Sequence, residues 1–226
     1  MDFGLPTDSL LLLGGNLYGT TLGIGSCAEG ECGTVFELTP PNSGQTSWNE
    51  NVLFSFGGAS GANPSANLIG DATGNLFGTT QYGGNLDCAV NVGGCGIVFE
   101  LSPPVGGTGP WTQTTLLTFD ITNGDFPLAG LAMDSAGNLY GTTSRGGPQC
   151  TNNDENCGCG SAFMLAPPIG GQGPWTQTVL ISFIAPNGCI PQIGQGLIRD
   201  QTGNLYGTTQ SGGQNNLGTV FELMPP

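Results

Sequence analysis

Apolar residues recur along this chain in short segments, and none of them follows helical spacing over eleven or more positions. The sequence Asn-Leu-Tyr/Phe-Gly-Thr-Thr occurs four times, starting at Asn16, Asn75, Asn138 and Asn204. A segment of the type Gly-Thr-Val-Phe-Glu-Leu follows each copy, at residues 33–38, 96–101, 160–165 and 218–223. A third apolar segment follows three of them, at residues 51–56, 114–119 and 178–183. Short runs of this composition, bounded by Gly, Pro, Asn or Asp, predict β-strands.

An Asp-x-x-Gly sequence directly precedes three of the four Asn-Leu-Tyr/Phe copies. An Asp at this place bonds backbone N–H groups, and the Gly takes the positive φ that closes a tight turn. The pattern predicts a hairpin between a short first strand, at 68–71, 129–134 and 195–200, and the Asn-Leu-Tyr strand. The turn residues are Asp71, Gly74, Asn75, Asp134, Gly137, Asn138, Asp200, Gly203 and Asn204. We expect their role to be structural.

Four antiparallel strands in each of four units predict an all-β protein, a four-bladed β-propeller. The units span about 6–56, 64–119, 127–183 and 191–226, within a single domain of residues 1–226. The last unit stops after its third strand, so we expect residues 1–5 to pair with that strand and close the ring. A β-solenoid and a fragment of a larger propeller are the alternatives. A solenoid usually has shorter and more regular repeats.

The run Gly-Asn-Leu-Tyr-Gly-Thr-Thr followed by Gly-Thr-Val-Phe-Glu-Leu resembles the GloVer-type tandem repeat of bacterial surface and secreted proteins. All four copies carry it. The turn Asp-x-x-Gly-Asn is similar to that of NHL-like propellers. The resemblance implies an exported, propeller-like protein, often attached to the cell exterior, and it implies no particular activity.

The charge balance excludes some classes of partner. The net charge is −14, and Arg145 and Arg199 are the only Lys or Arg residues. Nucleic acid and anionic lipid are therefore not expected as partners, because phosphate groups are bound by Lys and Arg. No apolar run approaches the roughly 20 residues of a membrane-spanning helix. No signal peptide is visible at the start, so we expect either a mature form or a fragment.

Eight cysteines at partly repeated positions predict disulfides and an oxidising compartment. We expect the pairs Cys27–Cys32, Cys88–Cys95, Cys150–Cys159 and Cys157–Cys189. Zinc binding is the alternative. It is disfavoured because the chain has no His and no Cys-x-x-Cys pair.

Catalytic chemistry has few candidate residues. The lack of His and Lys removes the Ser-His and Cys-His nucleophile systems and Schiff-base chemistry. Carboxylates remain, but those of the turns have a structural role. Glu37, Glu100 and Glu222 recur on the third strand, where a polar face of the blade is the favoured interpretation. We expect no enzyme; a carboxylate-based glycosidase or lyase is the alternative.

Two other residue groups are candidate ligand sites. Asp154 and Glu155 lie in the densest cluster of oxygen ligands, so calcium is the candidate cofactor, with a solvated rim loop as the favoured interpretation. Trp48, Trp111 and Trp175 each precede the last strand of a unit. We expect them to anchor the blades, with sugar stacking as the alternative.

The sequence thus predicts an extracellular structural or interaction protein, secreted or at the cell surface. It is a candidate subunit of a self-assembling surface structure or fibre that uses strand complementation. Its expected partners are copies of itself or other surface proteins. A carbohydrate-binding propeller is the alternative function, and a polysaccharide-degrading enzyme is a weaker one.

Overall fold

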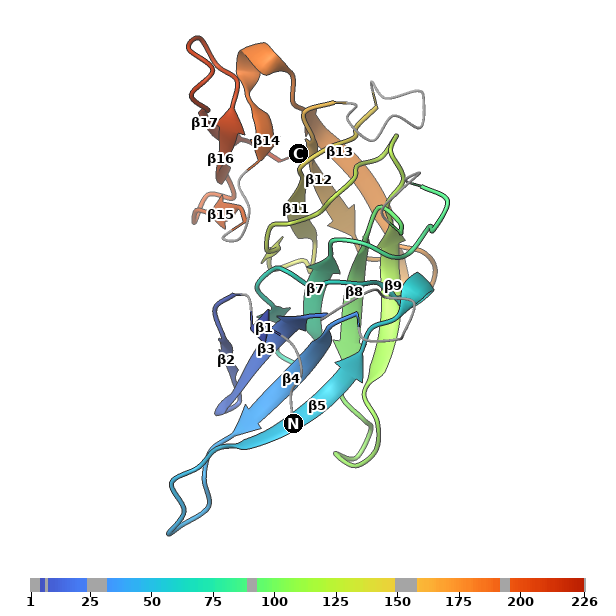
Figure 1. Ribbon diagram of the computed structural model, residues 1–226, viewed down its shortest axis with the longest axis vertical. Helices are drawn as coiled ribbons and strands as arrows, with labels where there is room; N and C mark the ends of the chain where they lie inside the picture. Colours follow the sequence, from blue (N-terminus) through green and yellow to red (C-terminus); the bar gives the residue numbers. More distant parts are fainter. Residues whose placement is uncertain are drawn as a thin grey trace.

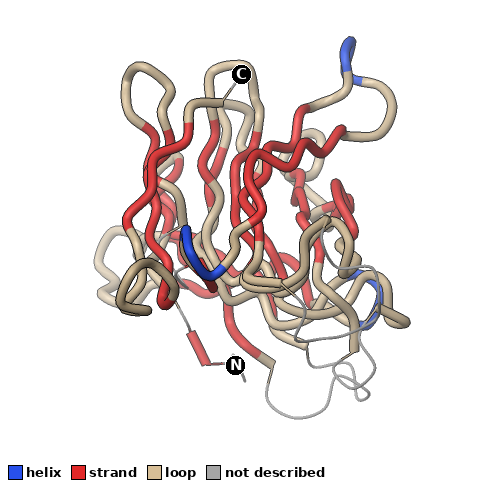
Figure 2. The backbone as a smooth tube through the Cα atoms, turned by 90° about the horizontal axis from the view of Figure 1, so that it is seen from above, coloured by secondary structure: helices blue, strands red, loops and turns tan. Residues whose placement is uncertain are grey.

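The computed structural model describes residues 5–6, 8–23, 32–88, 93–148, 158–191 and 196–225. Strands and loops make up nearly all of these residues (Figure 2). Helix in this part consists of three short 3-10 turns, η2 (Gly58–Ser60), η3 (Ile169–Gly171) and η4 (Ala185–Asn187). In the described ranges, no helix is long and apolar enough to cross a bilayer.

The two central sheets have the predicted four strands. Blade 2 has the order β6 (Ile69–Gly70), β7 (Leu76–Thr80), β8 (Ile97–Ser102), β9 (Thr112–Thr118). Blade 3 has the order β10 (Ala132–Met133), β11 (Leu139–Thr143), β12 (Ser161–Ala166), β13 (Thr176–Ser182). All neighbouring strands are antiparallel, and both sheets have a register shift between the third and fourth strands. The repeated sequence therefore folds into the same sheet twice.

The two outer sheets have an interrupted first strand. In blade 1, β1 (Leu5–Pro6) and β2 (Leu11–Leu13) both pair with β3 (Asn16–Leu22), which is followed by β4 (Thr34–Thr39) and β5 (Asn49–Ser55). In blade 4, β14 (Cys189–Pro191) and β15 (Ile198–Arg199) both pair with β16 (Leu205–Ser211). The other neighbour of β16 is β17 (Val220–Leu223). Within the described part of blade 4, no strand lies on the outer side of β17.

The four antiparallel sheets are arranged around one axis, which confirms the predicted four-bladed β-propeller and excludes the solenoid. Figure 1 shows blade 1 at one end of the long axis, blade 4 at the other, and blades 2 and 3 between them. The predicted ring closure is wrong for the residues that can be examined. Leu5 and Pro6 pair with Leu22 and Thr21 of β3, in their own blade, and not with β17. The physical reason is that β3 is longer than β2, so its exposed backbone groups offer a nearer partner. Residues 1–4 lie outside the described residues.

Each blade has a face toward the following blade, the forward face, and a face toward the preceding one, the rear face. Side chains alternate between the two faces along a strand. The forward face carries Tyr18, Thr20, Val35 and Glu37 in blade 1, Phe77, Thr79, Val98 and Glu100 in blade 2, Tyr140, Thr142, Ala162 and Met164 in blade 3, and Tyr206, Thr208, Val220 and Glu222 in blade 4. The rear face carries the residues between them, including Phe36, Phe99, Phe163 and Phe221.

The core lies between successive blades. One cluster of buried residues combines the forward face of blade 1 with the rear face of blade 2, and another combines blades 2 and 3 in the same way. A smaller cluster joins blade 3 to blade 4 through Tyr140, Leu197 and Leu205. Apolar burial of this kind is the main favourable term in folding. The propeller is therefore held together by one interface that occurs three times.

Phenylalanine pairs form the centre of this interface. The Phe directly after the fourth strand of one blade packs at a steep angle against the rear-face Phe of the next: Phe56 on Phe99, Phe119 on Phe163, and Phe183 on Phe221, with ring centroids 5.0, 5.4 and 4.9 Å apart. Gly78 lies directly against the Phe99 ring, and a Cβ there would stand 2.6 Å from Cζ of Phe99. This close approach explains why the repeated Tyr/Phe-Gly-Thr-Thr segment has glycine at its centre.

Candidate functional site

The repeated Asp side chains are fully engaged in their turns. Asp71 Oδ1 accepts hydrogen bonds from the backbone N–H groups of Thr73 and Asn75, at 2.8 and 2.9 Å, and Oδ2 accepts from Asn75 Nδ2 at 2.9 Å. Burial alone would raise the pKa of Asp71, but the hydrogen bonds from Thr73 and Asn75 outweigh it and lower the pKa. Asp134 makes the equivalent bonds with Ala136 and Asn138. Ionised acceptors held in this way stabilise the turn.

Tyrosine hydroxyls form hydrogen bonds with carboxylates in blades 1, 3 and 4. Tyr18 donates to Glu37 at 2.9 Å, and Tyr140 donates to Asp134 at 3.0 Å. The Tyr206 hydroxyl lies 3.2 Å from Asp200 and 2.9 Å from Glu222. These carboxylates therefore form hydrogen bonds within their own blades.

Blade 2 differs because Phe77 replaces the tyrosine. Glu100 is consequently left with Ser102 as its hydrogen-bond donor, at 3.2 Å. Burial raises the pKa of Glu100, the Ser102 hydroxyl opposes this, and the Asp71 carboxylate raises the pKa further. Desolvation and a neighbouring like charge both disfavour the ionised form.

Metal binding has no support in the part of the chain that the structure describes. No group of three or more His, Cys, Asp or Glu side chains comes together there. The calcium candidates Asp154 and Glu155 lie outside the described residues.

Two disulfides are present in the described residues. Cys88–Cys95 is confirmed as predicted. Cys159 pairs with Cys189, with a Cα–Cα distance of 4.4 Å, so the predicted pairs Cys150–Cys159 and Cys157–Cys189 are wrong. The reason is tertiary: Ile190 N donates to the carbonyl oxygen of Cys159 at 2.9 Å, which brings the chain entering blade 4 directly beside Cys159.

The remaining cysteines are less fully defined. Cys32 is disulfide-bonded, while Cys27, its predicted partner, lies outside the described residues. Cys150 and Cys157 also lie outside them.

The tryptophans occupy two kinds of environment. The ring of Trp111 lies 6.2 Å from that of Tyr18, and the ring of Trp175 lies 6.5 Å from that of Phe77. Each of these Trp side chains thus packs on the forward face of the preceding blade. Trp48, at the equivalent place in blade 1, is 45% exposed.

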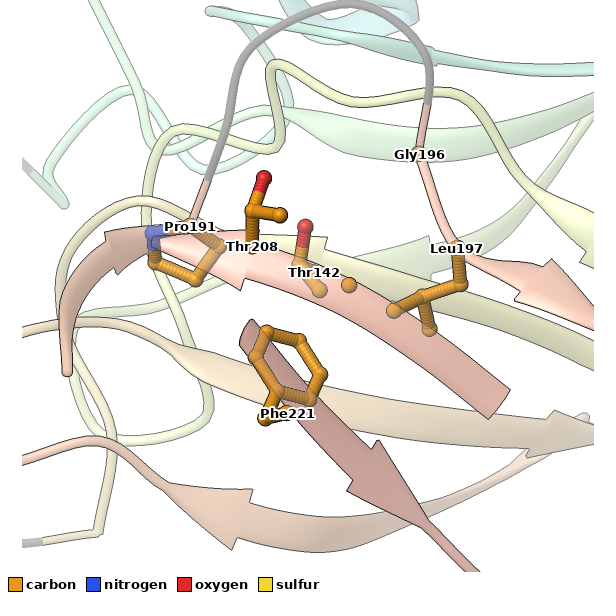
Figure 3. A pocket seen from close by; sticks show the side chains of 7 residues that line it. Thr142, Pro191, Gly196, Leu197, Thr208 and Phe221 are labelled. Carbon is orange, nitrogen blue, oxygen red and sulfur yellow. The ribbon is translucent and has the colours of Figure 1, made fainter. Parts of the chain in front are cut away.

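A hollow between blades 3 and 4 has a cavity volume of about 10 Å³. Figure 3 shows the hydroxyl groups of Thr142 and Thr208 on one side of it and the ring of Phe221 on the other. Pockets for small molecules are usually about 300–1,000 Å³. This hollow is therefore too small to be the main site.

An aromatic cluster at the junction of blades 2 and 3 was not predicted from the sequence. The ring of Tyr82 lies 5.2 Å from that of Phe126, and Cζ of Arg145 lies 4.7 Å above the Phe126 centroid. Cation–π contacts of this kind stabilise by about 0.5–2 kcal/mol. One of the two arginines is therefore part of the packing between blades. The rarity of Arg in the sequence was the only signal that could have directed attention to it.

The forward face of blade 4 is uncovered. Val220 is 81% exposed, whereas the equivalent residues of the other blades, Val35, Val98 and Ala162, are 0% exposed. Ile198 on the same face is 68% exposed. Sequence reasoning missed this surface because Val220 stands in the same motif as its buried counterparts.

The rear face of blade 1 is exposed only in part, because its Phe36 is 7% exposed. Leu10 is 44% exposed, while its counterparts Leu68, Leu131 and Leu197 are nearly buried. Leu12 is 68% exposed. Leu10 and Leu12 therefore lie exposed on this face of blade 1. In the described ranges, no core cluster joins blade 4 to blade 1.

The repeat motif has a match among known families. The model of the Gloeobacter/Verrucomicrobia repeat matches residues 2–154. The chain belongs to this family. No curated protein matches its sequence.

Solved structures similar to this Gloeobacter/Verrucomicrobia repeat protein share its propeller fold. A luciferin-regenerating enzyme superposes with a TM-score of 0.51 at 16% identity, over 93% of this chain and 58% of the other. Inulosucrase from Halalkalicoccus jeotgali gives 0.50 at 14% identity, over 94% and 61%. The repeat protein thus spans about three-fifths of the length of these chains. At such identities the likeness concerns the fold alone.

The described geometry of the repeat protein therefore favours its two uncovered blade faces as the candidate site. Val220 and Leu10 are exposed there, although their counterparts are buried in the internal blade–blade interfaces. Exposed apolar surface usually marks an interaction site where it is contiguous.

Proposed function

We propose that the protein is an exported structural and interaction module that binds partners by completing its fourth blade. The observation that carries this proposal is the 81% exposure of Val220, at a position that is fully buried in the other three blades. A valine at this position contributes to stability only when another apolar surface covers it.

The free edge of β17 supports the same proposal. In blades 1 to 3, a fourth strand pairs with the third along six residues, as β13 does with β12. Within the described residues, β17 pairs only with β16. An unpaired edge offers backbone N–H and C=O groups to an added strand. The side chains that would normally guard such an edge are scarce, since charged residues make up 8% of the chain.

Disulfides and composition support an extracellular location. Cys88–Cys95 and Cys159–Cys189 persist in oxidising compartments. A net charge of −14 keeps an exported protein soluble through mutual repulsion. Carbohydrate binding stays a prediction; Trp111 and Trp175 give it no support because their rings pack between blades.

Strand completion can be tested with a peptide of the fourth-strand pattern. The labelled peptide Thr-Gln-Thr-Val-Leu-Ile-Ser-Phe, the sequence of residues 176–183, is titrated into the protein, with a scrambled peptide of the same composition as the control. We expect saturable binding in fluorescence anisotropy and a rise in melting temperature, because a ligand of the native state stabilises it. Equal behaviour of the two peptides would contradict the proposal.

A further inference from the structure

Blade 3 differs from blades 2 and 4 in the antiparallel residue pair at which the chain enters the blade. This pair is Ala62 with Tyr82 in blade 2, Cys189 with Ser211 in blade 4, and Asp125 with Arg145 in blade 3. Asp125 and Arg145 exchange two backbone hydrogen bonds, each of 3.0 Å. Side chains of such a cross-strand pair project from the same face. Blade 3 therefore carries a carboxylate and a guanidinium side by side, where its neighbours carry uncharged residues.

The fold does not require a charge at this position. Asp125 is 1% exposed, and its counterpart in blade 2, Ala62, is 2% exposed and apolar. A buried ion pair is often no more stable than apolar residues of similar volume, because both charges lose their hydration. The stability of the repeat therefore does not account for the charged pair.

Polar side chains of blade 2 lie beside this pair. The Tyr82 ring packs against Phe126, over which Arg145 lies, and Gln81 Nε2 donates to the Tyr82 hydroxyl at 3.1 Å. Burial raises the pKa of Tyr82, the Arg145 charge lowers it and the Asp125 charge raises it, so both charges lie near this hydroxyl. Gln81, Tyr82 and Arg145 are only partly buried, so a ligand can reach them.

We propose that Gln81, Tyr82 and Arg145 bind a neutral carbohydrate at the junction of blades 2 and 3, with Asp125 as the buried residue that positions Arg145 and Tyr82. Sugar hydroxyls both donate and accept hydrogen bonds. The guanidinium and the amide supply donors, and the amide oxygen supplies an acceptor. The partly exposed Tyr82 ring offers an apolar surface to the C–H groups of a sugar. This site lies apart from the open edge of blade 4 and involves none of the tryptophans.

The charges favour a neutral ligand over an anionic one. Arg145 stands beside the Asp125 carboxylate, and the chain carries a net charge of −14. A phosphate or carboxylate group would therefore gain little from Arg145 and would be repelled by the rest of the protein. A site built from hydrogen-bonding side chains also rejects ligands that leave those side chains unpaired.

The first test is an array of labelled neutral oligosaccharides of glucose, xylose, arabinose and fructose, with oligogalacturonides as the charged comparison. An oligosaccharide that binds is then titrated calorimetrically into Tyr82→Phe, which removes only the hydroxyl, and into Arg145→Lys, which keeps the charge but loses the planar guanidinium. Arg199→Lys is the matched control, because Arg199 is the other arginine and lies on β15 of blade 4. Melting curves check that each variant folds.

We expect at least one neutral oligosaccharide to bind, and each of the two site variants to raise its dissociation constant about threefold to tenfold, as the loss of a hydrogen bond does. Arg199→Lys should bind as the unmodified protein does. The inference is overturned if no neutral oligosaccharide binds, if only oligogalacturonides bind, or if the site variants bind as tightly as the control. The fourth-strand peptide should bind Tyr82→Phe normally, so this site and the proposed function can fail independently.

The variant Asp125→Ala separates a positioning role from a structural one, because it introduces the residue of blade 2. It should leave the melting temperature unchanged or raise it, since the remaining Arg145 is partly exposed and can be hydrated. It should nevertheless weaken oligosaccharide binding as much as Arg145→Lys does. A lower melting temperature with unchanged affinity would show that Asp125 serves only the fold.

Discussion

In this propeller, the hydrogen bonds that a side chain can form depend on the residue that faces it on the neighbouring strand. The third strand carries Glu37 in blade 1 and Glu100 in blade 2, in the same sequence context. Glu37 accepts hydrogen bonds from Tyr18 and from Asn16 Nδ2, at 2.9 and 2.7 Å. Glu100 faces Phe77, which has no hydroxyl, and its pKa is raised by burial and by Asp71. One aromatic substitution therefore turns a satisfied carboxylate into one that is costly to ionise.

The variant Glu100→Gln should raise the melting temperature at pH 7. A folded-state pKa above the unfolded value means that the protonated form contributes stability at low pH, and that this stability is lost as pH rises through the folded-state pKa. Gln keeps the oxygen that accepts from Ser102 and removes the charge. The gain should vanish below about pH 4, where the carboxyl is protonated in both states.

Thermal unfolding followed by circular dichroism between pH 3 and 8 measures this effect. Glu50→Gln is the matched control, because it makes the same change of net charge at an exposed position of β5. A gain in melting temperature as large in the control as in Glu100→Gln would contradict the explanation.

At the scale of secondary-structure elements, the two disulfides join different parts of the propeller. Cys88–Cys95 closes a loop within blade 2, with a sequence separation of 7. Cys159–Cys189 has a separation of 30 and ties the start of β12 to β14, the first strand of blade 4. A longer closed loop restricts the unfolded chain more strongly. The second disulfide is therefore the covalent link that secures the terminal blade to its neighbour.

Removing the two disulfides should have unequal effects. In the chain-entropy model, Cys88→Ala with Cys95→Ala costs about 2 kcal/mol, and Cys159→Ala with Cys189→Ala costs about 3.5 kcal/mol. Guanidinium unfolding under non-reducing conditions measures both losses. Blade 4 should also separate from blade 3 at lower denaturant in the second variant. A larger loss from the Cys88–Cys95 pair would show that strain or local packing outweighs loop length.

Across the whole molecule, the interfaces between successive blades differ in the number of buried residues. Among the described residues, the clusters between blades 1 and 2 and between blades 2 and 3 each contain eleven buried side chains, while the cluster between blades 3 and 4 contains three. Repeat architectures are stabilised by the sum of such nearest-neighbour interfaces. Blade 4 thus has one small interface and an exposed forward face, so it is the least stable part of the described propeller.

Hydrogen exchange of the protein should reveal this difference in stability between the blades. We expect backbone amides of β8 and β12 to exchange slowest, because they open only in global unfolding, and amides of β15 and β17 to exchange fastest. Uniform protection of all four blades would be incompatible with this distribution of stability.

Much of the fold follows from local pattern. Strand alternation, the Asp-x-x-Gly-Asn turns and the four-unit repeat act over a few residues, so they predict the sheets and their class without knowledge of distant contacts. The Cys88–Cys95 pair was predictable for the same reason, because both residues belong to one loop. The Cys159–Cys189 pair was not, since only the packing of blade 4 on blade 3 brings Ile190 against Cys159.

The sequence by itself determined that each unit forms one twisted antiparallel sheet with two apolar faces, because side-chain alternation and turn chemistry are local. Tertiary structure alone decided which of those faces is covered. Val35 and Val220 have the same neighbours in sequence, yet one is buried and the other is 81% exposed. Burial depends on whether another blade lies alongside, and no residue within the unit carries that information.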